Sequence, residues 1–114
     1  MNLTGNWSYT EDFELGRSNG AANLHQVGSK VSGTFTFTEE VENDYKIEVI
    51  EEVKGTIADG KVLLKSVEVK AMQSGKEVAY LPNCFEMFLV SENKLVGSTY
   101  DSEDVCGVFV MEKQ

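Results

Sequence analysis

The fold class is indicated by the stretch Val31-Ser32-Gly33-Thr34-Phe35-Thr36-Phe37-Thr38. Apolar residues or glycine occupy every second position, and hydroxyl-bearing residues fill the positions between them. This alternation is typical of a β-strand with one buried face and one solvated face. Glycine weakens a strand, so Gly33 indicates a sharp bend or the close approach of another backbone.

The same apolar-x-Gly-small pattern recurs along the chain. It surrounds Gly5, Gly33 and Gly55, and looser copies surround Gly97 and Gly107. Because a small closed β-barrel needs bends in several of its strands, the repeat favours a barrel.

Short turns separate the other period-two segments, and Asp59-Gly60 is the strongest hairpin signal because both residues tolerate positive φ. The longest connection is expected at Glu11–Ala21, and a bulge is expected near Lys65-Ser66, where the parity of the apolar residues slips. Pro82-Asn83 interrupts the pattern, so the segment after it is either a continuation past a kink or a new strand. The first predicted strand begins near Leu3, and the others are Ala22–Val27, Lys30–Glu40, Tyr45–Ala58, Lys61–Met72, Glu77–Leu81, Cys84–Val90, Lys94–Tyr100 and Val105–Glu112.

We therefore predict an all-β fold with little or no helix. The 114 residues form one domain, 1–114, which is a closed eight-stranded antiparallel up-and-down barrel. Closure is favoured because an open meander of this size leaves exposed edges. The alternative is a two-sheet sandwich, which needs longer crossovers than these turns provide.

The charge balance excludes some partners. A formal net charge of -9 repels the phosphates of nucleic acids and anionic membrane surfaces. The apolar stretches are also far shorter than the roughly 20 residues of a membrane span. A chain made as written implies a cytoplasmic protein, whereas a trimmed mature form implies a secreted or periplasmic one.

The residues offer little for catalysis or metal binding. Cys84 and Cys106 permit one disulfide or two free thiols, and neither has the neighbours of a zinc cluster. His25 is the sole histidine and stands in no nucleophile motif, so we expect no enzyme, no metal and no cofactor.

Acidic residues gather in two places. Glu39, Glu40, Glu42 and Asp44 form a run that continues through Glu48, Glu51 and Glu52, and it is interpreted as a solvated face that protects strand edges. Asp101-Ser102-Glu103-Asp104 lacks the glycine and spacing of a calcium loop.

The motif Gly5-Asn6-Trp7, followed by Val31-Ser32-Gly33-Thr34-Phe35, resembles the calycin group of lipocalins, fatty-acid-binding proteins and avidins, and the layout is most similar to avidins. The resemblance implies that Trp7 packs across one barrel end and closes it. Avidins line the biotin site with several tryptophans, whereas this chain has one, which argues against biotin. Intracellular fatty-acid binders use buried arginines, and the sole arginine here, Arg17, falls in the predicted first loop.

The barrel interior is the best functional lead. Large side chains predicted to point inward either line a cavity for a small apolar ligand or fill the barrel. A hollow barrel indicates a lipocalin-like binding protein, and a filled one indicates a protein-binding module such as a protease inhibitor. The candidate ligand-binding residues are Trp7, Tyr9, Phe35, Phe37, Tyr45, Phe85, Met87 and Phe109.

The last three strands carry apolar residues on both faces. A barrel buries only its inner face, so the outer face is expected to meet another surface. We predict a homodimer or higher oligomer, in agreement with the C-terminal association of avidin-like barrels. The alternative is a parity shift that hides these residues inside. The candidate contacts are Phe88, Val96, Tyr100, Val108 and Val110.

Overall fold

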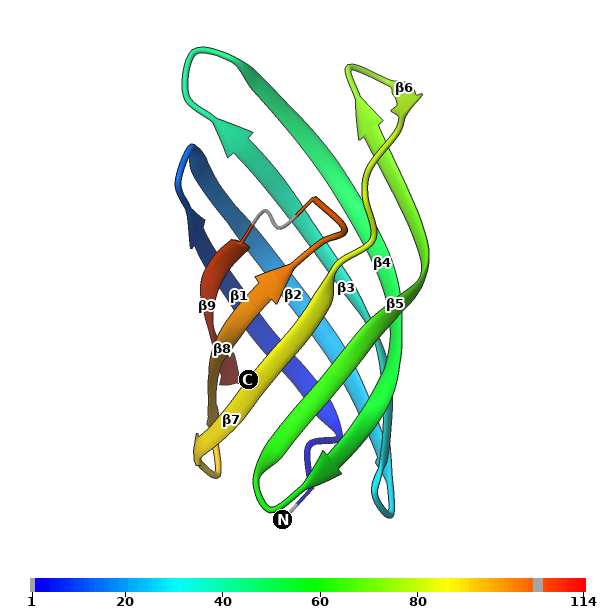
Figure 1. Cartoon of the computed structure of the whole chain (residues 1–114), viewed down its shortest axis with the longest axis vertical. Helices are drawn as coiled ribbons and strands as arrows, with labels where there is room; N and C mark the ends of the chain where they lie inside the picture. Colours follow the sequence, from blue (N-terminus) through cyan, green and yellow to red (C-terminus); the bar gives the residue numbers. More distant parts are fainter. Residues whose placement is uncertain (1, 104–105) are drawn as a thin grey trace.

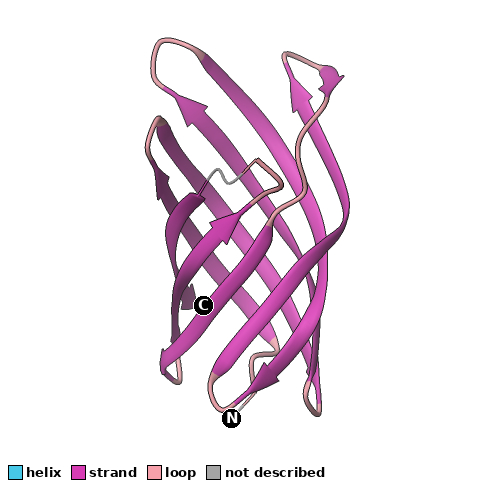
Figure 2. Cartoon of the chain, in the orientation of Figure 1, coloured by secondary structure: helices cyan, strands magenta, loops and turns pink. Residues whose placement is uncertain are grey.

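The computed structural model describes residues 2–103 and 106–114, and within these ranges every regular element is a β-strand (Figure 2). No helix in this part of the chain has the length and apolarity needed to cross a membrane. The strands are β1 (Gly5–Phe13), β2 (Gly16–Val27), β3 (Lys30–Val41), β4 (Tyr45–Ala58), β5 (Lys61–Gln73), β6 (Lys76–Val78), β7 (Cys84–Ser91), β8 (Lys94–Tyr100) and β9 (Cys106–Lys113).

The strands form a closed antiparallel barrel (Figure 1). Strand order is β4-β3-β2-β1-β9-β8-β7-β5-β6, and the additional pairing of β4 with β5 closes the ring. β6 pairs only with the end of β5, so the wall itself has eight strands. The closed eight-stranded up-and-down barrel predicted from the sequence is confirmed, and the sandwich is wrong.

The two ends of the barrel differ. The closed end carries the N-terminus and the turns at 28–29, 59–60 and 92–93, while the open end carries the connections at 14–15, 42–44 and 74–75 (Figure 1). Asp59 and Gly60 have φ of 53° and 77°, as the predicted hairpin requires. Trp7 is fully buried and its indole Nε1 donates a hydrogen bond to the Leu3 carbonyl oxygen at 2.8 Å.

Aromatic rings fill the middle of the barrel. Phe35 stacks on Phe85 with ring centroids 4.5 Å apart, and Tyr9 meets Phe35 edge-on at 5.2 Å. Tyr9 and Phe85 also contact the ring of Phe109, at 5.4 and 6.0 Å. Trp7 and these rings belong to one buried hydrophobic cluster.

Three of the five recurring glycines mark close backbone approaches, as predicted, whereas a β-carbon on Gly5 or Gly107 would meet only a side chain. A β-carbon on Gly33, Gly55 or Gly97 would overlap the carbonyl oxygen of a residue on the adjacent strand. These positions therefore let the strands coil tightly around a narrow barrel.

Two predicted boundaries were wrong or incomplete. Glu11–Ala21 is not a loop, because β1 continues to Phe13 and β2 begins at Gly16. Its polar residues hide the strand pattern, yet they pair with neighbouring strands on both sides. The strand Glu77–Leu81 ends at Val78, and residues 79–83 lead from β6 down to β7 outside any regular strand, so β7 begins as a new strand (Figure 1).

The bulge predicted near Lys65-Ser66 lies one residue further on. Glu52 pairs with Glu68 and Val53 with Ser66, so Val67 is the extra residue. Asp104 and Val105, which belong to the last predicted turn and strand, lie outside the described residues.

Candidate functional site

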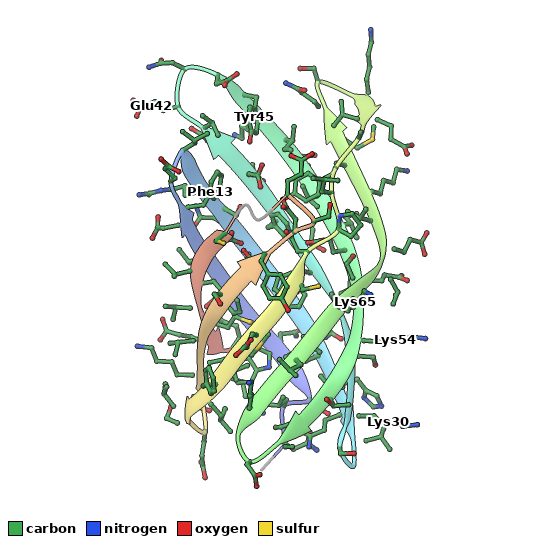
Figure 3. The ribbon with its side chains drawn as sticks, viewed as in Figure 1. Phe13, Lys30, Glu42, Tyr45, Lys54 and Lys65 are labelled. Carbon is green, nitrogen blue, oxygen red and sulfur yellow. The ribbon has the colours of Figure 1, made fainter. Side chains whose placement is uncertain are left out.

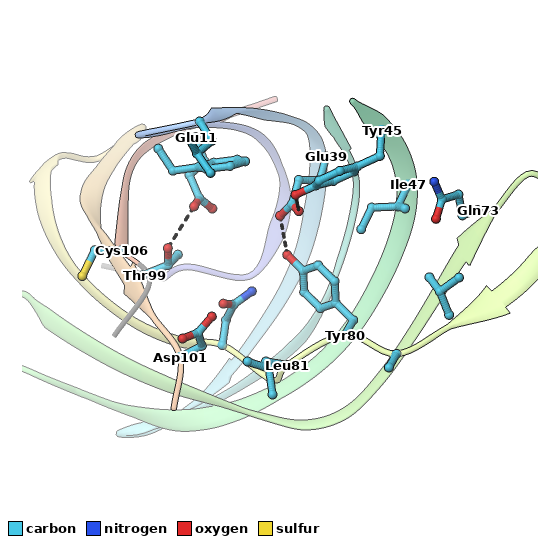
Figure 4. Close-up of a pocket in the computed structure, with 15 residues that line it drawn as sticks. Glu11, Glu39, Tyr45, Ile47, Gln73, Tyr80, Leu81, Thr99, Asp101 and Cys106 are labelled. Atoms are coloured by element: carbon cyan, nitrogen blue, oxygen red, sulfur yellow. Dashed lines mark hydrogen bonds between the residues drawn. The ribbon is translucent and has the colours of Figure 1, made fainter. Parts of the chain in front are cut away.

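A cavity of about 430 Å³ opens at the open end of the barrel, above the aromatic core (Figure 4). Its wall combines apolar side chains with a larger number of polar ones, and polar groups of this kind fix the orientation of a ligand in a small-molecule site. The apolar part is formed by Phe13, Leu15, Ile47, Val78, Ala79 and Leu81, and the polar part by Glu11, Glu39, Tyr45, Gln73, Tyr80, Asn83, Thr99, Asp101 and Cys106.

Glu11 projects from β1 into the barrel and is only 8% exposed. The Tyr9 hydroxyl donates to its Oε1 atom, and the Thr99 hydroxyl donates to Oε2 at 2.9 Å. Room for this carboxylate exists because β9 has glycine at position 107, where a β-carbon would overlap the Glu11 carboxylate. Burial raises the pKa of Glu11 despite these hydrogen bonds.

Glu39 projects from β3 toward the same cavity and accepts two tyrosine hydroxyls. The Tyr80 hydroxyl donates to the Oε1 atom of Glu39 at 2.6 Å, and the Tyr45 hydroxyl donates to its Oε2 atom at 2.9 Å (Figure 4). One carboxylate on β3 is therefore joined both to β4 and to the segment 79–83. Burial, together with the hydrogen bond to Glu39, raises the pKa of Tyr45 to about 12 and also raises that of Tyr80. Both phenols are therefore neutral donors at physiological pH.

Glu51 lies deeper, on β4, with none of its surface exposed. The backbone amide of Asn83 donates to Oε1 and the side-chain amide donates to Oε2, both at 3.0 Å. Burial raises the pKa of this carboxyl group as well. The interior near the cavity thus holds three carboxyl groups whose donors are all neutral.

No positive side chain balances these groups. None of the ten lysine and arginine residues, nor His25, lines the cavity, and the structure describes all of them. Lys30 and Lys54, for example, extend outward from the wall (Figure 3). A buried carboxylate without a positive partner is costly, so the site favours either a proton or a bound cation.

Ser18 adds an unsatisfied oxygen to this region. It pairs in the sheet with Glu11 on one side and Glu39 on the other, and its side chain is 1% exposed. Its Oγ atom has no hydrogen-bond partner in the structure. Ser18 does not line the cavity, and its Oγ atom is covered by neighbouring atoms.

The predicted interior residues divide between core and cavity. Of these residues, only Tyr45 lines the cavity, where it is half-buried. The others all point inward but belong to the packed core, and their predicted role as ligand contacts stays a prediction. These residues are Trp7, Tyr9, Phe35, Phe37, Phe85, Met87 and Phe109.

The sequence interpretation missed the polar half of the site. Glu39 and Glu51 were assigned to a solvated face, which is wrong for Glu51, and Glu11 was placed in a loop. The alternation of residues indicated that these side chains point inward. Glu11 follows the inward residues Trp7 and Tyr9 at every second position, and Glu51 follows Val49 in the same way. Thr99 follows Leu95 and Gly97 in the same way, whereas Tyr80 and Asn83 lie outside regular strands and had no such signal.

The two cysteines are not joined to each other. Cys84 pairs with Tyr100, which in turn pairs with Cys106, so the thiols stand two strands apart. Two strand spacings amount to about 9–10 Å, beyond the roughly 7 Å that a disulfide spans between Cα atoms. The disulfide alternative is therefore wrong for this fold.

The predicted oligomer contacts lie on the outer face, as their parity requires. Phe88, Tyr100, Val108 and Val110 are exposed, with Val108 at 65%, and Val96 is half-buried between them. No parity shift hides these residues inside the barrel.

The chain is similar in structure to designed β-barrels. The redesigned barrel mFAP1, bound to DFHBI, matches with a TM-score of 0.65 and 12% identity over 98% of this chain and 94% of that chain. The redesigned barrel mFAP0, also bound to DFHBI, matches with a TM-score of 0.63 and 12% identity over 98% of each chain. A de novo designed fluorescence-activating β-barrel matches with a TM-score of 0.58 and 8% identity over 99% of this chain and 94% of that chain. No protein-family model and no curated protein matches this chain.

Proposed function

We propose that this protein is a non-enzymatic, calycin-like barrel that binds a small molecule in the cavity at its open end. The observation that carries the proposal is the cavity itself, about 430 Å³ in volume and backed by a rigid aromatic core. That volume falls within the usual range of small-molecule sites, roughly 300–1,000 Å³.

Fold analogy supports the proposal. The structurally similar barrels mFAP1 and mFAP0 are both bound to a small molecule, DFHBI. This chain shares their fold at low identity, so the analogy concerns the capacity of such a barrel to hold a ligand and leaves the ligand to be argued from the site.

A titration with 3-phenylpropan-1-ol, a neutral aromatic probe, tests the proposal. Amide resonances of residues around Tyr45, Ile47 and Thr99 are expected to shift in ¹H–¹⁵N spectra. Val78→Trp fills the cavity and is expected to abolish the shifts, while the matched change Val27→Trp, at an exposed position outside the cavity, is expected to leave the shifts unchanged. Shifts confined to the outer face, or none at all, would refute the proposal.

We also propose that the exposed apolar face of β7, β8 and β9 binds a second copy of this chain. Phe88, Val96, Val108 and Val110 line one shallow groove on that face. A two-fold dimer uses the same patch on both subunits, and an apolar patch can meet itself without the repulsion that the acidic surface imposes elsewhere.

A further inference from the structure

We propose that the cavity selects an organic cation: a small molecule with a protonated amine at one end and an apolar, preferably aromatic, body. This inference rests on the proposed function, since it names the chemical class of ligand for the same site. Three observations carry it: the inward carboxylates, the absence of basic side chains from the cavity wall, and the apolar part of that wall.

The carboxylates supply the charge. Glu11 and Glu39 lie two strands apart, both facing the cavity, and every donor that reaches them is a neutral hydroxyl. A hydrogen bond between an ammonium and a carboxylate is about twice as strong as one between neutral groups. The site is thus better matched to a cation than to any neutral group.

The oxygens also match an ammonium in number. A primary ammonium carries three N–H donors. Glu11 on β1 and Glu39 on β3 flank Ser18 of β2 in the sheet, and their carboxylate oxygens supply acceptors for these three donors.

The rest of the wall selects the body of the ligand. Phe13, Tyr45 and Tyr80 offer aromatic faces, and Leu15, Ile47, Val78 and Leu81 offer aliphatic contacts. An aromatic ring stacks well here, and a cation gains further from neighbouring aromatic faces. A bare metal ion is a poor match, since no group of three or more metal-ligating side chains is found among the described residues.

The same charges exclude anions. A ligand carboxylate would face Glu11, Glu39 and Asp101 in the cavity wall without a basic partner. Like charges brought together in a cleft of low polarity repel strongly. The expected order of affinity is therefore cation, then neutral molecule, then anion.

Three probes with one body and different head groups test the inference. The probes are 3-phenylpropylamine, 3-phenylpropan-1-ol and 3-phenylpropanoate, titrated into the intact protein by calorimetry at pH 7.5. We expect the amine to bind at least about tenfold more tightly than the alcohol, and the propanoate to be the weakest. Equal binding of amine and alcohol would overturn the cation inference and leave the proposed function standing, whereas no binding by any probe would overturn both.

Matched variants locate the effect. Glu39→Gln removes one inward carboxylate, and Glu40→Gln removes its exposed neighbour on the same strand, so the two variants have the same net charge. Glu39→Gln is expected to reduce the preference for the amine over the alcohol to about threefold or less, while Glu40→Gln retains it. An equal loss in both variants would show that the preference comes from the overall negative field, and would overturn the assignment to this cavity.

Discussion

Both carboxylate oxygens of Glu51 accept hydrogen bonds from Asn83, one from its backbone amide and one from its side chain. The pair joins the middle of β4 to the segment 79–83, which leads from β6 to β7. Because the same segment carries Tyr80, the Glu51–Asn83 contact helps to hold that phenol against Glu39. The buried carboxyl group thus supports the wall of the cavity.

Asn83→Leu is expected to lower the free energy of unfolding by about 2–4 kcal/mol. The change removes the side-chain donor and leaves a fully buried carboxyl group with a single hydrogen bond from this residue. Urea unfolding measures the loss. Asn93→Leu, in an exposed turn, is the control and is expected to change stability by less than about 0.5 kcal/mol. Equal effects of the two changes would contradict the structural role of the pair.

Strand parity predicted most of the barrel, because the hydrophobic alternation at Val31–Thr38 and the turn at Asp59-Gly60 are local signals. The alternation did not reveal the strands where polar residues occupy inward positions. Because Glu11 and Ser18 stand at inward positions where a hydrophobic residue is expected, two paired strands were interpreted as a loop. In this region tertiary packing decides which side chains are buried.

The cavity was even less accessible to sequence reasoning. Its chemistry depends on residues from separate stretches of the chain, such as Glu11, Glu39 and Thr99, whose proximity follows from barrel closure. Asn83 lies in an irregular segment, where no period predicts the direction of a side chain. In similar sequences, a glutamate that continues a series of alternating apolar residues indicates a carboxylate inside the barrel.

Trp7→Ala is expected to destabilise the protein by about 3–5 kcal/mol, as large core truncations do. The indole is fully buried at the closed end and donates to the Leu3 carbonyl, so the change opens a hole in the base of the core. Chemical denaturation gives the magnitude. The native fluorescence of the parent is expected to be blue-shifted, and an emission maximum typical of water-exposed indole would contradict the burial.

Glu11→Gln is expected to become more stable than the parent as the pH rises. Burial, aided by the charges of Glu39 and Glu51, raises the pKa of Glu11 above 4.5, while hydrogen bonds from Tyr9 and Thr99 oppose the rise. Between 4.5 and that raised pKa, the folded state binds more protons than the unfolded state. The free energy of unfolding therefore falls as the pH increases through this window, and a neutral side chain avoids the fall.

Thermal unfolding of Glu11→Gln from about pH 4 to pH 8 checks this sign. The gain over the parent is expected to be small at the acidic end, where Glu11 is protonated in both states, and to grow toward neutral pH. Glu40→Gln, which changes an exposed residue, is the control, and its difference in stability from the parent is expected to stay the same across this pH range. A gain that shrinks as the pH rises would contradict the raised pKa.

Sedimentation equilibrium at micromolar concentration is expected to give twice the chain mass. Val108→Lys places a charge in the exposed apolar groove of β7–β9 and is expected to shift the protein to monomer. Ile50→Lys, which changes an exposed apolar residue on β4, is the matched control and leaves the dimer intact. A monomeric parent would contradict the proposed self-association.

A crystal structure of the protein with 3-phenylpropylamine shows whether the cavity holds an organic cation. We expect the phenyl ring to occupy the cavity among Phe13, Tyr45 and Tyr80. The ammonium nitrogen should then lie within about 3 Å of carboxylate oxygens of Glu11 and Glu39. An empty cavity, or an amine that turns away from both carboxylates toward solvent, would contradict it.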